Sequence, residues 1–213
     1  MDLLNQQLSD YIDSHTSPES KVLDALNRET NAKVLMPRML SGHLQGRVLS
    51  MLSKMIQPRR ILEIGTYTGY SALCLAEGLI DNGFLHTIDI NDELNSMVKK
   101  YIHAANMDEK IITHIGNALD IIPQLNEVFD IVFIDADKVN YSRYFDMIMD
   151  KVRKGGFIIA DNVLWSGKIT LPENEADKDT RALQIFNEKV HNDPRVEHVL
   201  FPVRDGLMVM RKL

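Results

Sequence analysis

The sequence predicts an α/β fold in which a mostly parallel β-sheet carries helices on both faces. Two observations lead to this prediction. After Pro58, short runs rich in β-branched and aromatic residues alternate with segments long enough to form crossover helices, a pattern typical of a parallel sheet. The last two β-rich runs are joined by a short turn, so they must pair with each other in antiparallel fashion. The expected sheet is therefore parallel with an antiparallel edge.

The N-terminal part of the chain is expected to be helical. One face of a first helix carries the apolar residues Leu4, Leu8, Tyr11 and Ile12. A stronger stripe at helical spacing consists of Leu44, Val48, Leu49, Leu52, Met55 and Ile56. Pro58 follows this stripe and ends the helix, because proline lacks the N–H that the next helical hydrogen bond needs.

The remaining elements follow in alternating order. Strands are predicted at 60–64, 84–89, 111–115, 129–135 and 156–161. Crossover helices are predicted at 70–79, 92–105, 118–125 and 141–152. A helix at 182–191 precedes the final strands at 196–202 and 206–211, which meet at the turn 204–206. The polar stretch 171–180 is expected to be a loop, either a solvated connection or a cover for a substrate. We expect one domain over 1–213, with a helical segment 1–57 and an α/β core 58–213.

Composition and charge exclude several classes of protein. The chain has 213 residues, of which 45% are hydrophobic and 25% charged, which is enough for one sizeable core. A net charge of −6 argues against a broad DNA-binding surface. The single cysteine, Cys74, excludes an intrachain disulfide and a cysteine-based zinc cluster and fits a cytoplasmic location. Neither a signal peptide nor an apolar run of about 20 residues is visible, so no membrane partner is expected.

Four acidic residues fall at the ends of predicted strands: Glu63, Asp89, Asp135 and Asp161. Ligands of open α/β sheets bind outside the carboxyl ends of the strands. A single acid at such a position is usually a cap or a surface group. Four acids at one rim would repel one another unless a cation or hydrogen-bond donors offset their charge. This pattern predicts a site that takes a cationic ligand.

A glycine-containing loop follows the first predicted strand. The run EIGTYTGYS places Gly65 directly after the strand and Gly69 four residues later, which is not the G-x-G-x-x-G spacing of a pyrophosphate loop. Asp89, at the end of the next strand, is where an acid commonly binds ribose hydroxyls. An acid for ribose without a phosphate loop favours S-adenosylmethionine, whose sulfonium is a cation. A dinucleotide is the alternative.

A second group of polar residues lies at 135–138 and 161–162. Asp135, Asp161 and Asn162 offer hard oxygen ligands with no Cys or His nearby in the sequence, which suits Mg²⁺, Mn²⁺ or Ca²⁺ better than zinc. The alternative for Asp161 and Asn162 is a turn that caps a helix. Lys138 is either a surface lysine or, beside a metal and a cationic cofactor, a general base.

These motifs carry a family resemblance. The runs EIGTYTGYS, FIDADK, ADNVLWSGK, DPRVE and PVRDGL occur in this order between Met36 and the C-terminus. The chain thereby resembles the cation-dependent O-methyltransferases of the caffeoyl-CoA and catechol type. The resemblance implies a Rossmann-like class I methyltransferase fold, with a seven-stranded sheet that ends in an antiparallel hairpin. It also implies a homodimer.

The resemblance also implies a role for each matching residue. The implied cofactor-binding residues are Ser41, Glu63, Gly65, Thr66, Tyr67, Ser71, Asp89, Ala118 and Asp137, with Asp89 on the ribose and Ala118 against the adenine. The implied metal ligands are Asp135, Asp161 and Asn162. Lys138 would be the catalytic base, with Asp135 as its catalytic neighbour, and Trp165 and Ser166 would border the acceptor.

The expected reaction is in-line transfer of a methyl group from S-adenosylmethionine to a vicinal-diol phenol such as catechol, caffeate or a caffeoyl-CoA-like ester. Ser166 stands where plant caffeoyl-CoA enzymes carry Asn, which favours a free catechol. The first alternative is a tRNA hydroxyuridine O-methyltransferase, against which the negative net charge argues. A non-catalytic nucleotide-binding module is the second. A dehydrogenase is disfavoured by the absence of G-x-G-x-x-G.

Overall fold

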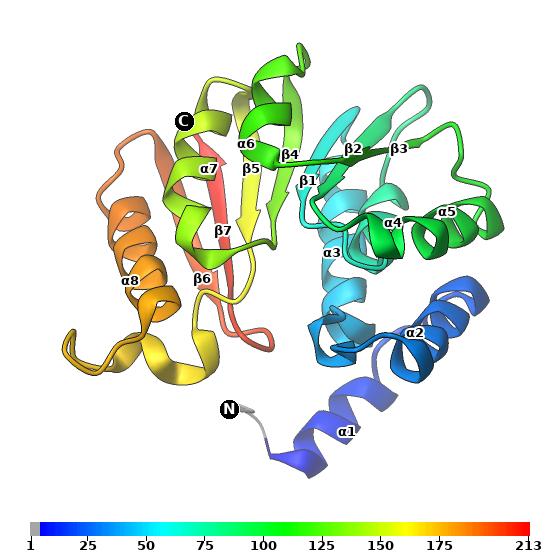
Figure 1. The fold of residues 1–213 in the computed structure, drawn as a ribbon, viewed down its shortest axis with the longest axis horizontal. Helices are drawn as coiled ribbons and strands as arrows, with labels where there is room; N and C mark the ends of the chain where they lie inside the picture. The colour runs from blue at the N-terminus through cyan, green and yellow to red at the C-terminus, as the bar shows by residue number, and fades with distance from the viewer. Residues whose placement is uncertain (1–4) are drawn as a thin grey trace. The chain divides into compact units, whose positions relative to one another are not determined.

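The computed structural model describes residues 5–213, so Leu4 of the first predicted stripe lies outside the described residues. The chain divides into two compact units, one covering 5–121 and one covering 122–213. Figure 1 shows both units, with the colour running from blue at the N-terminus to red at the C-terminus. That the whole of 1–213 forms one domain stays a prediction.

The first unit begins with helices. The hydroxyl of Ser20 accepts a hydrogen bond from the backbone N–H of Leu23 and so caps a helix at 21–33 that we did not predict separately. The helix predicted from the stripe at 44–56 is confirmed, and it ends in a left-handed Gln57 directly before Pro58. These elements are α1 (Gln6–Ser14), α2 (Lys21–Lys33), the 3₁₀ turn η1 (Pro37–Met39) and α3 (Gly42–Ile56).

Three parallel strands of this unit lie where the sequence predicted them. They are β1 (Arg60–Ile64), β2 (Phe84–Asp89) and β3 (Ile111–Ile115), in the spatial order β3-β2-β1. The helices between and after them are α4 (Tyr70–Ala76), α5 (Asn95–Ala104) and α6 (Ala118–Ile121). The helix predicted to begin at Asp92 starts as a 3₁₀ turn, η2 (Asp92–Leu94), which the Asn91 side chain caps by accepting a hydrogen bond from Glu93 N–H.

The second unit contains the antiparallel edge. Strand β4 (Phe129–Ile134) pairs in parallel with β5 (Val152–Ala160), and β7 (Leu207–Lys212) pairs antiparallel with both β5 and β6 (Val196–Phe201). Its remaining elements are η3 (Ile122–Gln124), η4 (Lys138–Asn140), α7 (Tyr141–Met149), η5 (Trp165–Thr170) and α8 (Lys178–His191). The predicted C-terminal hairpin is confirmed (Figure 1).

Two predicted starts in this unit are wrong by four residues each, and the helix predicted at 141–152 ends earlier, at Met149. Strand β5 begins at Val152 rather than at 156, because Val152 already pairs with Phe129 across an irregularity in register. Helix α8 begins at Lys178 rather than at 182. The Asp177 side chain accepts a hydrogen bond from Thr180 N–H and starts the helix inside the stretch predicted to be a loop.

The predicted fold class is confirmed. The strands are mostly parallel, in the order β3-β2-β1 in the first unit and β4-β5-β7-β6 in the second, where the C-terminal pair is antiparallel, and helices lie around them. The central strands are buried along most of their length: every residue of β1 after Arg60 is buried, as are the last four of β4. Such continuous burial is typical of strands covered on both faces. Over residues 5–213, no helix is both long enough and apolar enough to cross a membrane.

Candidate functional site

Asp89 ends strand β2 and has its carboxylate held by two backbone donors. Oδ2 accepts a hydrogen bond of 2.7 Å from Tyr67 N–H, and Oδ1 accepts one of 2.8 Å from Asn91 N–H. Each carboxylate oxygen can accept more than one hydrogen bond. The side chain is therefore oriented by the protein and keeps the capacity to bind hydroxyl groups of a ligand.

The loop between β1 and α4 is built by left-handed residues. Gly65 has φ 105°, Tyr67 φ 50° and Gly69 φ 86°. The Gly65 N–H donates to Ile88 O of β2, and the Gly69 N–H donates to Thr66 O within the loop. Glycine adopts this conformation freely, whereas a bulky residue such as Tyr67 adopts it only where its surroundings hold it. The bond from Tyr67 N–H to Asp89 is one such constraint.

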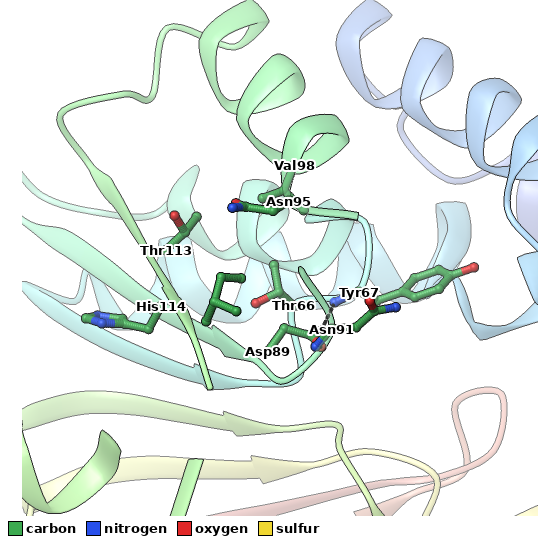
Figure 2. A pocket seen from close by; sticks show the side chains of 9 residues that line it. Thr66, Tyr67, Asp89, Asn91, Asn95, Val98, Thr113 and His114 are labelled. Atoms are coloured by element: carbon green, nitrogen blue, oxygen red, sulfur yellow. Dashed lines mark hydrogen bonds between the residues drawn. The ribbon is translucent and has the colours of Figure 1, made fainter. Parts of the chain in front are cut away.

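A pocket opens beside Asp89, and Figure 2 shows the side chains that line it. The lining residues are Thr66, Tyr67, Asp89, Asn91, Asn95, Val98, Thr113, His114 and Ile115. Three of these were predicted as cofactor-binding residues; the other six were not. Asn91 could have been found from its place just after the strand end, whereas Thr113 and His114 lie within β3. Among the described residues, no donor reaches the buried Oδ1 of Asn95.

Glu63 lies within β1 and is fully buried. Its Oε2 accepts a hydrogen bond of 2.5 Å from Thr87 Oγ1 on β2. Thr66 Oγ1 lies 2.5 Å from Thr87 Oγ1. Since the single hydroxyl hydrogen of Thr87 points to Glu63, Thr66 is the donor in this second contact. The predicted cofactor residues Glu63 and Thr66 are thus joined through Thr87, which sequence reasoning missed because it sits inside a buried strand.

Three other predicted cofactor residues of this unit, Ser41, Ser71 and Ala118, are not part of the pocket lining. Ser41 precedes α3 and is 5% exposed, Ser71 lies in the first turn of α4, and Ala118 begins α6. The Tyr67 hydroxyl donates to Met36 O at 2.9 Å. The loop that holds Asp89 is therefore also tied to the segment just before Ser41.

Lys138 is the centre of the polar group in the second unit. Its side chain is 8% exposed, and Nζ donates to Asp135 Oδ1 (3.2 Å), Tyr141 OH (2.6 Å) and Asn162 Oδ1 (2.8 Å). Three acceptors satisfy all three N–H groups of an ammonium ion. The charged form of Lys138 is therefore fully hydrogen-bonded in the structure.

Tyr141 supports this lysine and was missed by sequence reasoning. Its hydroxyl accepts from Lys138 and donates to Asp161 O at 3.0 Å. Burial raises the pKa of Tyr141 well above its ordinary value, and the nearby charges of Asp135 and Asp161 act in the same direction. The phenol therefore stays neutral and keeps its donor. The signal in the sequence is only its spacing of three residues from Lys138.

The predicted metal ligands come from the ends of paired strands. Asp135 follows β4 and Asp161 follows β5, next to the paired residues Ile134 and Ala160. Asp161 is 2% exposed, and its Oδ1 accepts from Asn162 N–H at 2.7 Å. Within residues 5–213, no group of three or more His, Cys, Asp or Glu side chains is arranged to hold a metal ion. The predicted set is different, because it combines two carboxylates with one amide.

The donor set nevertheless fits a hard divalent cation. Oxygens of Asp135 and Asn162 both accept from the single ammonium of Lys138, so they already converge on one positive charge. Asp161, the residue before Asn162, has a buried carboxylate. Carboxylate and amide oxygens are the ligands that Mg²⁺, Mn²⁺ and Ca²⁺ prefer.

Three further predicted residues lie in this unit. Asp137 accepts hydrogen bonds of 2.6 Å from Tyr144 OH on Oδ1 and from Asn140 Nδ2 on Oδ2, so both its oxygens have partners on the following segment. Trp165 and Ser166 have left-handed backbone conformations, with φ 47° and 54°. The Ser166 N–H donates to the Asp205 carboxylate.

Comparison with known proteins identifies the family. A family model described as O-methyltransferase matches residues 13–213. The chain belongs to the O-methyltransferase family. The match includes both the Asp89 pocket and the Lys138 group, so both fall within the part of the chain that family members share.

Individual proteins that are similar to this chain are also O-methyltransferases. This O-methyltransferase is 36% identical over 197 residues to caffeoyl-CoA O-methyltransferase 5 of Nicotiana tabacum, covering 87% of this chain and 82% of the relative. It is 31% identical over 223 residues to the caffeoyl-CoA O-methyltransferase of Stellaria longipes, covering 99% and 92%. The crystal structure of an O-methyltransferase from Bacillus cereus in complex with SAH superimposes with a TM-score of 0.89 at 28% identity, covering 97% of each chain.

Proposed function

We propose that this chain transfers a methyl group from S-adenosylmethionine to one hydroxyl of a vicinal-diol phenol, and that the reaction depends on a divalent cation. The observation that carries the proposal is the convergence of Asp135 Oδ1 and Asn162 Oδ1 on the Lys138 ammonium. The solved relative from Bacillus cereus holds SAH, the product left when S-adenosylmethionine gives up its methyl group, and this supports the choice of methyl donor.

The methyl donor is bound by the first unit in this proposal. Asp89 accepts the ribose hydroxyls, because its carboxylate is held by Tyr67 N–H and Asn91 N–H and still has free lone pairs. Glu63 also holds the cofactor, Gly65, Thr66, Tyr67 and Ser71 line its methionine end, and Ala118 packs against its adenine. Ser41 and Asp137 are the remaining cofactor-binding residues of the proposal. S-adenosylmethionine, when bound, supplies an activated methyl group on a positively charged sulfur.

Asp135, Asp161 and Asn162 would hold the divalent cation. The chemistry that the cation would supply is a lowered pKa of the phenolic hydroxyl that reacts. Mg²⁺ is the first choice among the hard cations that suit this donor set, with Mn²⁺ and Ca²⁺ as alternatives.

Lys138 acts as the general base. It accepts the proton of the hydroxyl while the new O–CH₃ bond forms and the S–CH₃ bond breaks. The resulting ammonium is stabilised by Asp135, Tyr141 and Asn162, the acceptors that it contacts in the structure. General-base catalysis of this kind contributes about 10²–10⁴-fold in rate.

The acceptor in this proposal is a small phenolic molecule, with catechol and caffeate ahead of a caffeoyl-CoA-like ester, and it lies against Trp165 and Ser166. A vicinal diol is favoured because two adjacent hydroxyls can share one cation. The enzyme is expected to work as a homodimer in the cytoplasm.

A methyl-transfer assay with labelled S-adenosylmethionine tests the proposal. The acceptors are catechol, caffeate, caffeoyl-CoA and a hydroxylated tRNA, each with Mg²⁺ and with EDTA. We expect O-methylated diol with Mg²⁺, no turnover with EDTA, and recovery when Mg²⁺ is returned. Asp161→Ala should lose metal binding and activity together, while its circular dichroism spectrum is unchanged.

Each contrary result has a distinct meaning. Undiminished turnover after chelation would contradict the metal requirement. Product formed on tRNA alone would identify the tRNA enzyme instead. Binding of S-adenosylmethionine without turnover on any acceptor would indicate a non-catalytic binding module.

A further inference from the structure

The segment after β5 has an unusual backbone. Asn162, Trp165, Ser166 and Gly167 all have left-handed conformations, with φ of 58°, 47°, 54° and 79°. Only Gly167 adopts this conformation without a steric cost. A run of such residues persists only where other parts of the protein hold it, and such runs cluster where a ligand is bound. We name this segment the Trp165 turn (residues 162–167).

The turn between β6 and β7 holds it. Three residues of the Trp165 turn, Val163, Leu164 and Ser166, are tied to two residues of this hairpin. Val163 N–H donates to Gly206 O at 3.2 Å and Leu164 N–H donates to Asp205 O at 2.9 Å. Ser166 N–H donates to Asp205 Oδ1 at 2.5 Å. Asp205 thus binds the turn with both its main chain and its side chain.

Gly206 allows this close approach. A Cβ at this position would lie 2.5 Å from Leu164 Cγ and 3.1 Å from Leu164 N, and the residue itself has φ 88°. Any larger residue would push the hairpin away from Leu164. The hairpin and the Trp165 turn are therefore fitted to each other at backbone distance.

The held turn presents an indole with an unused donor. Trp165 Nε1 is buried and, among residues 5–213, has no hydrogen-bond partner. An indole N–H can only donate, and leaving it buried without an acceptor is unfavourable. The Lys138 ammonium lies 5.6 Å from the centroid of the Trp165 ring. The indole ring therefore lies close to the side chain to which we assign the base.

We propose that Asp205 and Gly206 are positioning residues for the acceptor: they hold the Trp165 turn so that the indole stays beside Lys138, where the phenolic substrate lies against it. This inference rests on the proposed function for the nature of the acceptor. The holding of the turn itself is independent of the reaction.

The test uses the fact that Trp165 is the only tryptophan in the chain, so intrinsic fluorescence reports on this turn alone. Asp205→Ala removes the acceptor of Ser166 N–H, whereas Asp205→Asn keeps an oxygen there. In the full chain we expect Asp205→Ala to shift the emission maximum and to raise acrylamide quenching at least twofold. Asp205→Asn should stay close to wild type in both.

The kinetic part separates a positioning role from general damage. Asp205→Ala should raise KM for the diol at least tenfold and leave KM for S-adenosylmethionine within twofold of wild type. Asp193→Ala is the matched control, because Asp193 is an acidic turn residue that bonds Arg195 rather than the Trp165 turn. It should change neither fluorescence nor KM.

Two results would overturn the inference. One is unchanged fluorescence in Asp205→Ala. The other is altered fluorescence with unchanged KM for the diol, or with both KM values raised equally. Failure of the proposed function looks different, because wild-type protein would then methylate no diol while the fluorescence of Asp205→Ala still shifted.

Discussion

Tyr67 N–H donates a hydrogen bond of 2.7 Å to Asp89 Oδ2, and the donating residue has a left-handed backbone with φ 50°. The same tyrosine donates through its hydroxyl to Met36 O. A strained residue thus links the carboxylate at the end of β2 to the segment before α3. Because the carboxylate is oriented before any ligand arrives, binding does not have to provide the free energy of ordering it.

Asp89→Asn should weaken binding of S-adenosylmethionine at least tenfold. The amide has one acceptor oxygen in place of two, so it cannot accept from both Tyr67 N–H and Asn91 N–H and also receive ribose hydroxyls in the same way. Isothermal titration calorimetry measures the affinity. Asp81→Asn, at an exposed position in the same unit, is the control and should bind as wild type does. Equal affinity of the Asp89 variant and wild type would show that Asp89 does not hold the cofactor.

Lys138→Met should lower kcat by about 10²–10⁴-fold, the range expected for loss of a general base. Affinity for S-adenosylmethionine should change little. Lys138→Arg is the informative companion, because arginine keeps the positive charge but does not deprotonate in proteins. If the arginine variant retained wild-type kcat, Lys138 would act through its charge and not as a base.

The folded protein should become less stable in acid because the Glu77 carboxylate is protonated there. Burial acts to raise the pKa of this carboxyl, but hydrogen bonds from Arg47, Lys54 and Ser50 outweigh it and lower the pKa from 4.5 to about 2. A pKa that is lower in the folded state gives stability that is fully present above pH 4.5 and is lost as the pH falls towards 2. The contribution is at most about 3 kcal/mol.

Urea unfolding of wild type and Glu77→Gln at several pH values between 6 and about 2.5 checks this dependence. The difference in unfolding free energy between the two proteins should shrink steadily below pH 4.5. A difference that stays constant over the whole range would contradict the assigned role of Glu77.

Gly78→Ala should destabilise the first unit by about 1–3 kcal/mol, as overpacking of a tight contact does. A Cβ at Gly78 would lie 2.3 Å from Ser53 C and 2.5 Å from Lys54 N, both backbone atoms of α3. Backbone cannot rotate away as a side chain can, so the helix itself must move. Chemical denaturation measures the loss. Ser96→Ala, on an exposed position of α5, should stay within about 0.5 kcal/mol of wild type.

The strands of this fold could be predicted closely because their signal is local. Strands β1, β2 and β3 lie at the predicted residues, since a run of β-branched and apolar residues between turn residues is visible in a short window. Helix α2 could not be predicted as a separate helix. Only Leu23, Leu26 and Thr30 are buried in it, so its apolar face is a weak signal in the sequence. The start of β5 depends on its pairing with Phe129, which no local window contains.

Some residues of the candidate site could likewise be predicted from local sequence, and others could not. Asp89, Asp135, Asp161 and Lys138 could be named in advance, because they follow strand ends and belong to short motifs. Their supporting partners could not. Thr87 is an unremarkable residue inside a strand until the register of β1 and β2 places it opposite Glu63, 24 positions away. Asp205 lies 39 positions from Ser166, and only the β6–β7 hairpin brings the two together.

From its pattern of residues alone, this chain specifies an α/β sheet, acids at the strand ends and a cofactor loop that is not a pyrophosphate loop. These properties depend on alternation and spacing along a few neighbouring residues. The hydrogen-bond partners that orient the acids, the convergence of three acceptors on Lys138 and the strained Trp165 turn are properties of the folded chain. They arise from strand register and turn geometry, which place groups from distant segments within 3 Å or so of one another.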